Sequence, residues 1–192
     1  MDRWLLRFAV AHRTQIMNHT ALRVAHWGST AAFELFVLAI VGVYAVRVRR
    51  LLMVPTVAAA ALAGTGAADV LKLIVQRPRP PYPYWLTHAS GYSMPSSVAA
   101  ITAAAVVATF LCLAPGERML RRLVGWGGGF LAFLAGGAVV YVGVHWPTDV
   151  IAGWVVGVVA AMAVARGFRQ LDRLYVGPRY PNLVTWPVGP TP

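Results

Sequence analysis

The sequence is poor in acidic residues, in lysine and in cysteine. It holds 6 Asp and Glu against 17 Lys and Arg, and Lys72 is the only lysine. Cys112 is the only cysteine and lies in an apolar block, so a disulfide framework and a cysteine metal site are both excluded. The first residues lack an apolar core followed by a small-residue cleavage site, which argues against a removable signal peptide.

Hydrophobic residues, by contrast, make up 58% of the chain, and charged residues only 12%. The apolar residues come in long blocks rather than amphipathic stripes, which is typical of a membrane protein. Because backbone polar groups must be paired inside a bilayer, we expect an all-α polytopic membrane bundle. Five blocks approach the length of about 20 residues that a bilayer span requires. They are residues 29–46, 52–75, 97–114, 123–144 and 149–166.

The two ends of the chain differ from this membrane domain, which we place at residues 29–166. Residues 1–28 mix apolar and basic side chains at roughly helical spacing. This pattern predicts an amphipathic helix lying in the membrane interface. Residues 167–192 are basic and rich in proline, so we expect an irregular tail there.

The net charge of +11 could indicate a nucleic-acid partner, but the placement of the arginines argues against one. Most arginines flank apolar blocks, which favours phospholipid headgroups and topology signals. Clusters follow the first, third and fifth blocks, so five spans would place all three on one side, predicted to be cytoplasmic. The loops between the other blocks then face away from the cytoplasm, across a bacterial inner or plasma membrane.

Three polar groups of residues are expected at that non-cytoplasmic boundary. The first is "KLIVQRPRP", residues 72–80. Lys72 and Arg79 could close on a phosphate from two directions, one as a point charge and the other as a bidentate fork. The simpler interpretation is that both side chains reach toward lipid headgroups without binding a substrate.

The second group is "GYSMPSSVAA", residues 91–100. Ser96 and Ser97 follow a proline and can begin a helix whose free N–H groups bind an anion. A plain helix cap is the simpler interpretation. The next residue, Val98, can neither donate nor accept a proton, so an anion cradle here has no acid beside it.

The third group is "HWPTD", residues 145–149. Asp149 follows His145 by four residues, across a proline that can open a helix, so its carboxylate can reach one imidazole nitrogen. Such a pair fixes the tautomer and leaves the other nitrogen free as a nucleophile. A structural cap is the alternative interpretation of the same pair.

Together these residues resemble the type 2 phosphatidic acid phosphatase superfamily, the lipid-phosphate phosphatases related to vanadium haloperoxidases. The family carries three motifs, K-x6-RP, PSGH and SR-x5-H-x3-D. The first is complete here, whereas Ser97 replaces the glycine and Val98 the histidine of the second. In the third, Ala138 and Val139 replace the serine and arginine, while the histidine and aspartate remain. The resemblance covers roughly residues 29–166.

The resemblance implies a role for each matching residue. His145 attacks phosphorus and forms a phosphohistidine, and Asp149 orients it. The phosphoryl oxygens are held by Lys72, Arg79 and the N–H groups near Ser96 and Ser97. The implied substrates are membrane lipid phosphates or isoprenoid diphosphates, and neither a metal nor another cofactor is implied.

The two valines remove groups on which the family chemistry relies. General acid catalysis contributes about 10²–10⁴-fold, and the loss of a charged transition-state donor costs on the order of 10²–10³-fold. A diphosphate needs the acid least, because the phosphate monoester that it expels is already a stable anion. Val98 and Val139 are then expected to form an apolar pocket wall. His88 and Glu34 are candidate substitute acids, against interfacial and helix-packing roles respectively.

Three functions therefore remain open from the sequence. The first is a divergent lipid phosphatase or diphosphatase, supported by the intact pair of His145 and Asp149. The second is a catalytically silent protein that binds a lipid phosphate, supported by the two valines. The third is an enzyme that lets a prenyl diphosphate ionise, giving prenyl transfer or terpene cyclisation. We favour the first, with a preference for diphosphates.

Overall fold

The computed structural model describes residues 2–28 and 31–171, and the side chains of residues 28–33 are not described. The described chain is helical and contains no β-strand, which confirms the predicted all-α class. The α-helices are α1 (Asp2–Ala11), α2 (Gln15–Gly28), α3 (Ala31–Arg47), α4 (Met53–Val75), α5 (Ser97–Cys112), α6 (Arg118–Arg122), α7 (Gly129–Tyr141) and α8 (Pro147–Leu171). A 3₁₀ turn, η1 (Tyr82–Tyr84), and a π-helical turn, η2 (Leu123–Gly128), complete the set.

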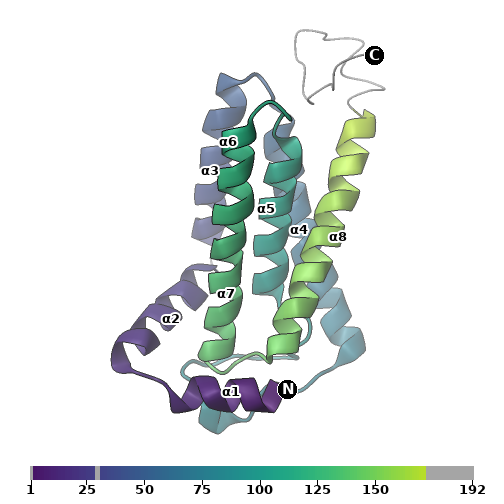
Figure 1. Ribbon diagram of the computed structural model, residues 1–192. Helices are drawn as coiled ribbons and strands as arrows, with labels where there is room; N and C mark the ends of the chain where they lie inside the picture. The colour runs from purple at the N-terminus through teal and green to yellow at the C-terminus, as the bar shows by residue number, and fades with distance from the viewer. Residues whose placement is uncertain (1, 29–30, 172–192) are drawn as a thin grey trace.

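The N-terminal segment forms two helices rather than the single helix that was predicted. The break lies between α1 and α2, where the Arg13 guanidinium donates to the carbonyls of Tyr84 and Tyr141. Thr14 then caps the next helix, because its Oγ1 accepts from the N–H of Met17 at 3.3 Å. As a result α1 lies across one end of the bundle, while α2 runs obliquely away from it (Figure 1).

Five helical segments stand side by side as a bundle, and they match the five apolar blocks (Figure 1). Helix α4, the continuous segment Arg118–Tyr141 and α8 are each long and apolar enough to cross a membrane. Helix α5 is apolar but shorter. Helix α8 continues past residue 166 to Leu171, so the first part of the predicted tail is helical, and residues 172–192 lie outside the described chain. The exact number of spans stays a prediction.

Small residues let α8 approach α5 closely. A Cβ atom at Gly153 would lie 2.4 Å from the carbonyl oxygen of Ser96, and one at Gly157 would lie 2.1 Å from that of Ala100. Both distances are far below van der Waals contact, so only glycine fits at these positions. Small residues spaced by four are the usual means of close helix packing in membranes. This packing brings the start of α5 against the first turns of α8.

The arginine clusters gather at the end of the bundle opposite α1. Arg50 after α3 forms an ion pair with Glu117 after α5 at 3.1 Å. Arg169 near the end of α8 donates to the carbonyl of Leu111 at 3.0 Å. The ends of α3, α5 and α8 therefore meet, and the loop 76–96 and the turn 142–146 lie at the other end (Figure 1).

Candidate active site

The three predicted polar groups meet at the end of the bundle where α1 lies. The N–H of Ser96 donates to the carbonyl of Asp149 at 2.9 Å, which joins the start of α5 to the start of α8. Arg79 of the loop after α4 donates to the carbonyl of Val144 at 2.8 Å. The N–H of Leu86 donates to the carbonyl of Val142 at 2.9 Å, which ties the same loop to the turn before α8. Segments far apart in sequence thus build one site.

His145 and Asp149 are the most buried charged or titratable pair of the site. The side chain of Asp149 is fully buried, and that of His145 is 8% exposed. His145 Nδ1 lies 3.5 Å from Asp149 Oδ2, while that oxygen accepts from the N–H of Trp146 at 2.8 Å. The two side chains therefore face each other, but the distance between them is longer than that of a good hydrogen bond. Catalytic hydrogen bonds are often long without substrate and tighten when it binds, so the predicted bond stays a prediction.

Arg79 lies against the other nitrogen of the imidazole. Its Nη1 is 3.3 Å from His145 Nε2, and three backbone carbonyls, those of Ser90, Gly91 and Val144, hold the guanidinium in place. A guanidinium has donors only, so Nε2 must offer its lone pair and the ring proton must sit on Nδ1. This is the tautomer whose Nε2 lone pair can attack a phosphorus atom.

Burial lowers the pKa of His145 below its usual value, because the ring is removed from water. Asp149 acts in the opposite direction, whereas the positive charges of Arg79 and Lys72 lower the pKa further. The net effect is a lowered pKa, which favours the neutral imidazole at neutral pH. A neutral ring is the form that can act as a nucleophile.

Lys72 lies at the last turn of α4 and reaches the first turn of α5. Its Nζ donates to Ser97 Oγ and to Asp69 Oδ1, the latter at 2.9 Å. Ser97 Oγ in turn donates to Asp69 Oδ1 at 2.7 Å. Asp69 was not predicted as a site residue. Its spacing of three residues before Lys72, which places both on one face of a helix, is the signal that could have found it.

Ser96 caps α5, as the sequence predicts. Its Oγ accepts from the N–H of Ala99 at 3.4 Å, and its own side chain is fully buried. The N–H groups of Ser97 and Val98 come before the first helical hydrogen bond, so they have no acceptor within the helix. Together with the positive end of the helix, they can receive an anion.

Val98 and Val139 lie in the same apolar cluster. Val139 is buried, and Val98 is half-buried and packs against the cluster that also contains Val144, the neighbour of His145. Two side chains that the family motif would make polar therefore pack in an apolar cluster next to the turn that carries His145. Neither can supply a proton or a positive charge to a bound phosphate.

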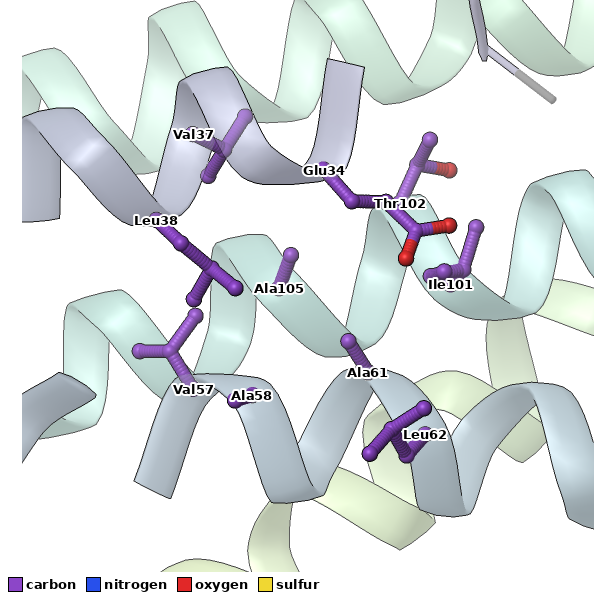
Figure 2. Close-up of a pocket in the computed structure, with 10 residues that line it drawn as sticks. All are labelled: Glu34, Val37, Leu38, Val57, Ala58, Ala61, Leu62, Ile101, Thr102 and Ala105. Atoms are coloured by element: carbon purple, nitrogen blue, oxygen red, sulfur yellow. The ribbon is translucent and has the colours of Figure 1, made fainter. Parts of the chain in front are cut away.

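The two candidate substitute acids, His88 and Glu34, lie in different surroundings. His88 is exposed in the loop before α5, where its ring meets the edge of Trp85. Glu34 of α3 faces a cavity of about 130 Å³ between α3, α4 and α5 (Figure 2). The other residues that line the cavity are Val37, Leu38, Val57, Ala58, Ala61, Leu62, Ile101, Thr102 and Ala105. None of the phosphate-site residues lines this cavity, so Glu34 faces a different space, whereas the role of His88 as a substitute acid stays a prediction.

Arg77 and Asp2 belong to the site although the sequence did not point to them. Arg77 Nη1 donates to Asp149 Oδ1 at 2.7 Å and to Thr148 Oγ1 at 2.6 Å, and Nη2 donates to Asp2 Oδ2 at 2.7 Å. The hydroxyl of Thr148 also donates to Asp2 Oδ2, at 2.6 Å. Burial works to raise the pKa of Asp2, but the hydrogen bonds from Thr148 and Arg77 outweigh it, and the pKa is lowered. Asp2 therefore stays ionised and ties α1 to the buried carboxylate.

The arrangement brings together an imidazole, a carboxylate and a set of cationic and N–H donors, which are groups of the kind that phosphoryl transfer uses. Among residues 2–28 and 31–171, no group of three or more His, Cys, Asp or Glu side chains is placed to hold a metal ion.

Comparison with protein-family models matches residues 50–173 to the PAP2 superfamily, which is more than half of the chain. The chain belongs to the PAP2 superfamily. The match includes all three motif regions of this PAP2 protein, so the resemblance suggested by the spacing of Lys72, Arg79, His145 and Asp149 is confirmed.

Solved PAP2 structures share this fold. One is the first transmembrane PAP2-type phosphatidylglycerolphosphate phosphatase from Bacillus subtilis, which is 27% identical with a TM-score of 0.71, over 91% of this chain and 87% of that chain. Another is LpxE from Aquifex aeolicus, which is 21% identical with a TM-score of 0.71, over 86% of this chain and 94% of that chain. The comparison with curated proteins found no match. The protein is an integral membrane protein with the fold of PAP2 lipid phosphatases.

Proposed function

We propose that this protein is a divergent membrane phosphohydrolase that removes a phosphoryl group from a lipid phosphate or a prenyl diphosphate. His145 is the nucleophile and Asp149 orients it. Lys72, Arg79 and the N–H groups at the start of α5 bind the phosphoryl oxygens. The active site faces away from the cytoplasm.

The observation that carries this proposal is the placement of His145 between Asp149 and Arg79. The carboxylate faces Nδ1 at 3.5 Å, and the guanidinium lies 3.3 Å from Nε2. The attacking lone pair and a positive charge for the phosphoryl oxygens are therefore next to each other. Phosphoryl transfer depends mainly on such positioning and charge stabilisation, so the retained groups supply its main requirements.

The reaction has two steps. In the first, a bond forms between His145 Nε2 and phosphorus, and the bond between phosphorus and the leaving oxygen breaks. In the second, water attacks the phosphohistidine, the bond between nitrogen and phosphorus breaks, inorganic phosphate leaves, the imidazole is restored, and the water gives up one proton to a base. Asp149 stabilises the positive charge that develops on the ring in the first step.

Val98 supports a preference for diphosphates. An alkoxide leaving group needs a proton as the bond breaks, and general acid catalysis of this kind contributes about 10²–10⁴-fold. A phosphate monoester expelled from a diphosphate leaves as a stable anion and needs that proton less. Val98, half-buried at the start of α5, also supplies an apolar surface that suits a substrate with a hydrocarbon chain.

Product analysis tests the proposal. The purified protein is reconstituted in lipid nanodiscs and incubated with a prenyl diphosphate, and phosphorus NMR follows the products. We expect prenyl monophosphate and inorganic phosphate, and no turnover by His145→Ala. Thr109→Val, which removes a hydroxyl that donates to the carbonyl of Ala105 within α5, is the matched control and should keep its activity.

Two other outcomes would replace the proposal. Release of intact inorganic diphosphate with a cyclic or transferred hydrocarbon would identify an enzyme that ionises the carbon–oxygen bond. Saturable binding of the diphosphate without turnover would identify a silent lipid-phosphate-binding protein, which the two valines favour.

A further inference from the structure

We propose that Ser97, Lys72 and Asp69 form a proton relay that protonates the leaving oxygen in place of an acid at position 98. This inference rests on the proposed phosphohydrolase function and deepens it. Lys72 is the proton source, Ser97 passes the proton on, and Asp69 is a positioning residue. Val98 leaves the site without the acid of the family motif, and the relay lies one residue away from it.

The three side chains form a closed set of hydrogen bonds between α4 and α5. Lys72 Nζ donates to Ser97 Oγ, and both donate to Asp69 Oδ1, at 2.9 Å from the ammonium and 2.7 Å from the hydroxyl. Ser97 is thus an acceptor toward the ammonium and a donor through its own proton. A hydroxyl in this position can take one proton and release another, which a purely structural contact does not require.

The relay also lies where a bound phosphate ester needs it. Ser97 is in the first turn of α5, whose N–H groups face the expected anion. The N–H of Ser96, the residue before Ser97, donates to the carbonyl of Asp149 at 2.9 Å, so the start of α5 lies against the segment that carries the partner of the nucleophile. A phosphoryl group bound between His145 and the start of α5 would place its leaving oxygen beside the hydroxyl of Ser97.

The proposed proton transfer balances over the two steps. As His145 Nε2 bonds to phosphorus and the ester bond breaks, the leaving oxygen takes the proton of the Ser97 hydroxyl, and Ser97 takes one from Lys72. When water attacks the phosphohistidine, the proton lost by that water returns through Ser97 to the neutral amine of Lys72. Asp69 holds the hydroxyl between turnovers and keeps the ammonium aimed at it.

A hydroxyl relay is a weaker acid than an imidazolium, so the expected preference for diphosphates remains. The relay instead predicts slow but measurable hydrolysis of alkyl monophosphates. It also predicts that removal of Ser97 Oγ affects substrates in proportion to how much their leaving groups need a proton.

The test compares two monophosphates with different leaving groups, a long-chain alkyl phosphate and 4-nitrophenyl phosphate. Ser97→Ala should lower kcat/KM for the alkyl ester by about 10²-fold or more, and for the nitrophenyl ester, whose phenolate leaves unprotonated, by less than about tenfold. Ser97→Thr keeps the hydroxyl and should restore most of the alkyl activity. Asp69→Asn should also lower kcat/KM for the alkyl ester more than kcat/KM for the nitrophenyl ester, but by a smaller factor than Ser97→Ala. Thr109→Val is again the matched control.

Each other outcome overturns the relay. Equal losses on both esters in Ser97→Ala would make the hydroxyl a phosphate-binding group only. Wild-type protein that hydrolyses the diphosphate but not the alkyl ester would show that no proton is supplied. Wild-type protein that neither hydrolyses any substrate nor forms a phosphohistidine would remove the proposed function together with the relay, so the two failures are distinguishable.

Discussion

The residue at position 98 is expected to determine which leaving groups the enzyme expels efficiently. Val98→His places a proton donor on the first turn of α5, at the edge of the cluster that contains Val144. We expect this variant to raise hydrolysis of an alkyl monophosphate by up to about 10²–10⁴-fold, and that of a diphosphate by much less. Parallel kcat/KM measurements on the two substrates give the ratio. The apolar control Val98→Ile should leave the ratio unchanged, and an equal rise for both substrates would contradict the assignment of an acid to this position.

The residues proposed to bear the chemistry could be predicted from spacing, but partners that are distant along the chain could not. Lys72, Arg79, His145 and Asp149 were found because fixed intervals connect them along the sequence. Asp2, which binds Arg77 at 2.7 Å, is separated from it by 75 positions. Such a contact depends on how an amphipathic helix docks on a bundle, and no local pattern records it.

At the scale of single elements, α1 is expected to act as a support for the site rather than only as a membrane anchor. Its Asp2 accepts hydrogen bonds from Arg77 and Thr148, and Arg77 holds Asp149. Asp2→Asn should lower kcat about tenfold, because a hydrogen bond to a charged group contributes about 1.5–3 kcal/mol. Steady-state kinetics in nanodiscs measure this effect.

Arg7→Gln is the matched control for α1, since it removes an exposed charge from the same helix. It should leave kcat unchanged. If Asp2→Asn and Arg7→Gln reduced kcat equally, the contribution of α1 would be general membrane attachment rather than support of Asp149.

The close packing of helix α8 against α5 depends on glycine residues. Gly157→Ala would place a Cβ 2.1 Å from the carbonyl oxygen of Ala100, so the helices must separate. We expect a loss of about 1–3 kcal/mol in stability, the usual cost of overpacking, measured as a lower Tm in detergent. Gly167→Ala on the same helix meets no atom within 4 Å and should leave the Tm unchanged or slightly higher. Equal Tm values for both variants would contradict the close packing of α5 and α8.

The five apolar blocks predicted the bundle helices because bilayer-spanning segments leave a strong compositional signal. The N-terminal segment was predicted as one helix, and the structure divides it at Arg13 and Thr14. The cause is tertiary, since the guanidinium of Arg13 reaches the carbonyls of Tyr84 and Tyr141. Amphipathic spacing alone continues across this break and cannot reveal it.

At the scale of the whole molecule, the orientation in the membrane decides which pool of lipid the site meets. We expect His88 on the non-cytoplasmic side and Met119, at the arginine-rich end, on the cytoplasmic side. His88→Cys should react in intact cells with a membrane-impermeant thiol reagent. Met119 is 82% exposed, and Met119→Cys should react only after permeabilisation. The native Cys112 is buried and serves as the unlabelled background. The reverse labelling pattern would contradict the predicted topology.

Formation of a phosphohistidine at His145 is the measurement that tests the central claim most directly. The protein is mixed with a prenyl diphosphate labelled at its terminal phosphorus, quenched during turnover and digested for peptide mapping. We predict an acid-labile, alkali-stable label on the peptide that carries His145, absent from His145→Ala and greatly reduced in Asp149→Asn. Steady turnover with no label on that peptide, or with the label unchanged in His145→Ala, would contradict the account.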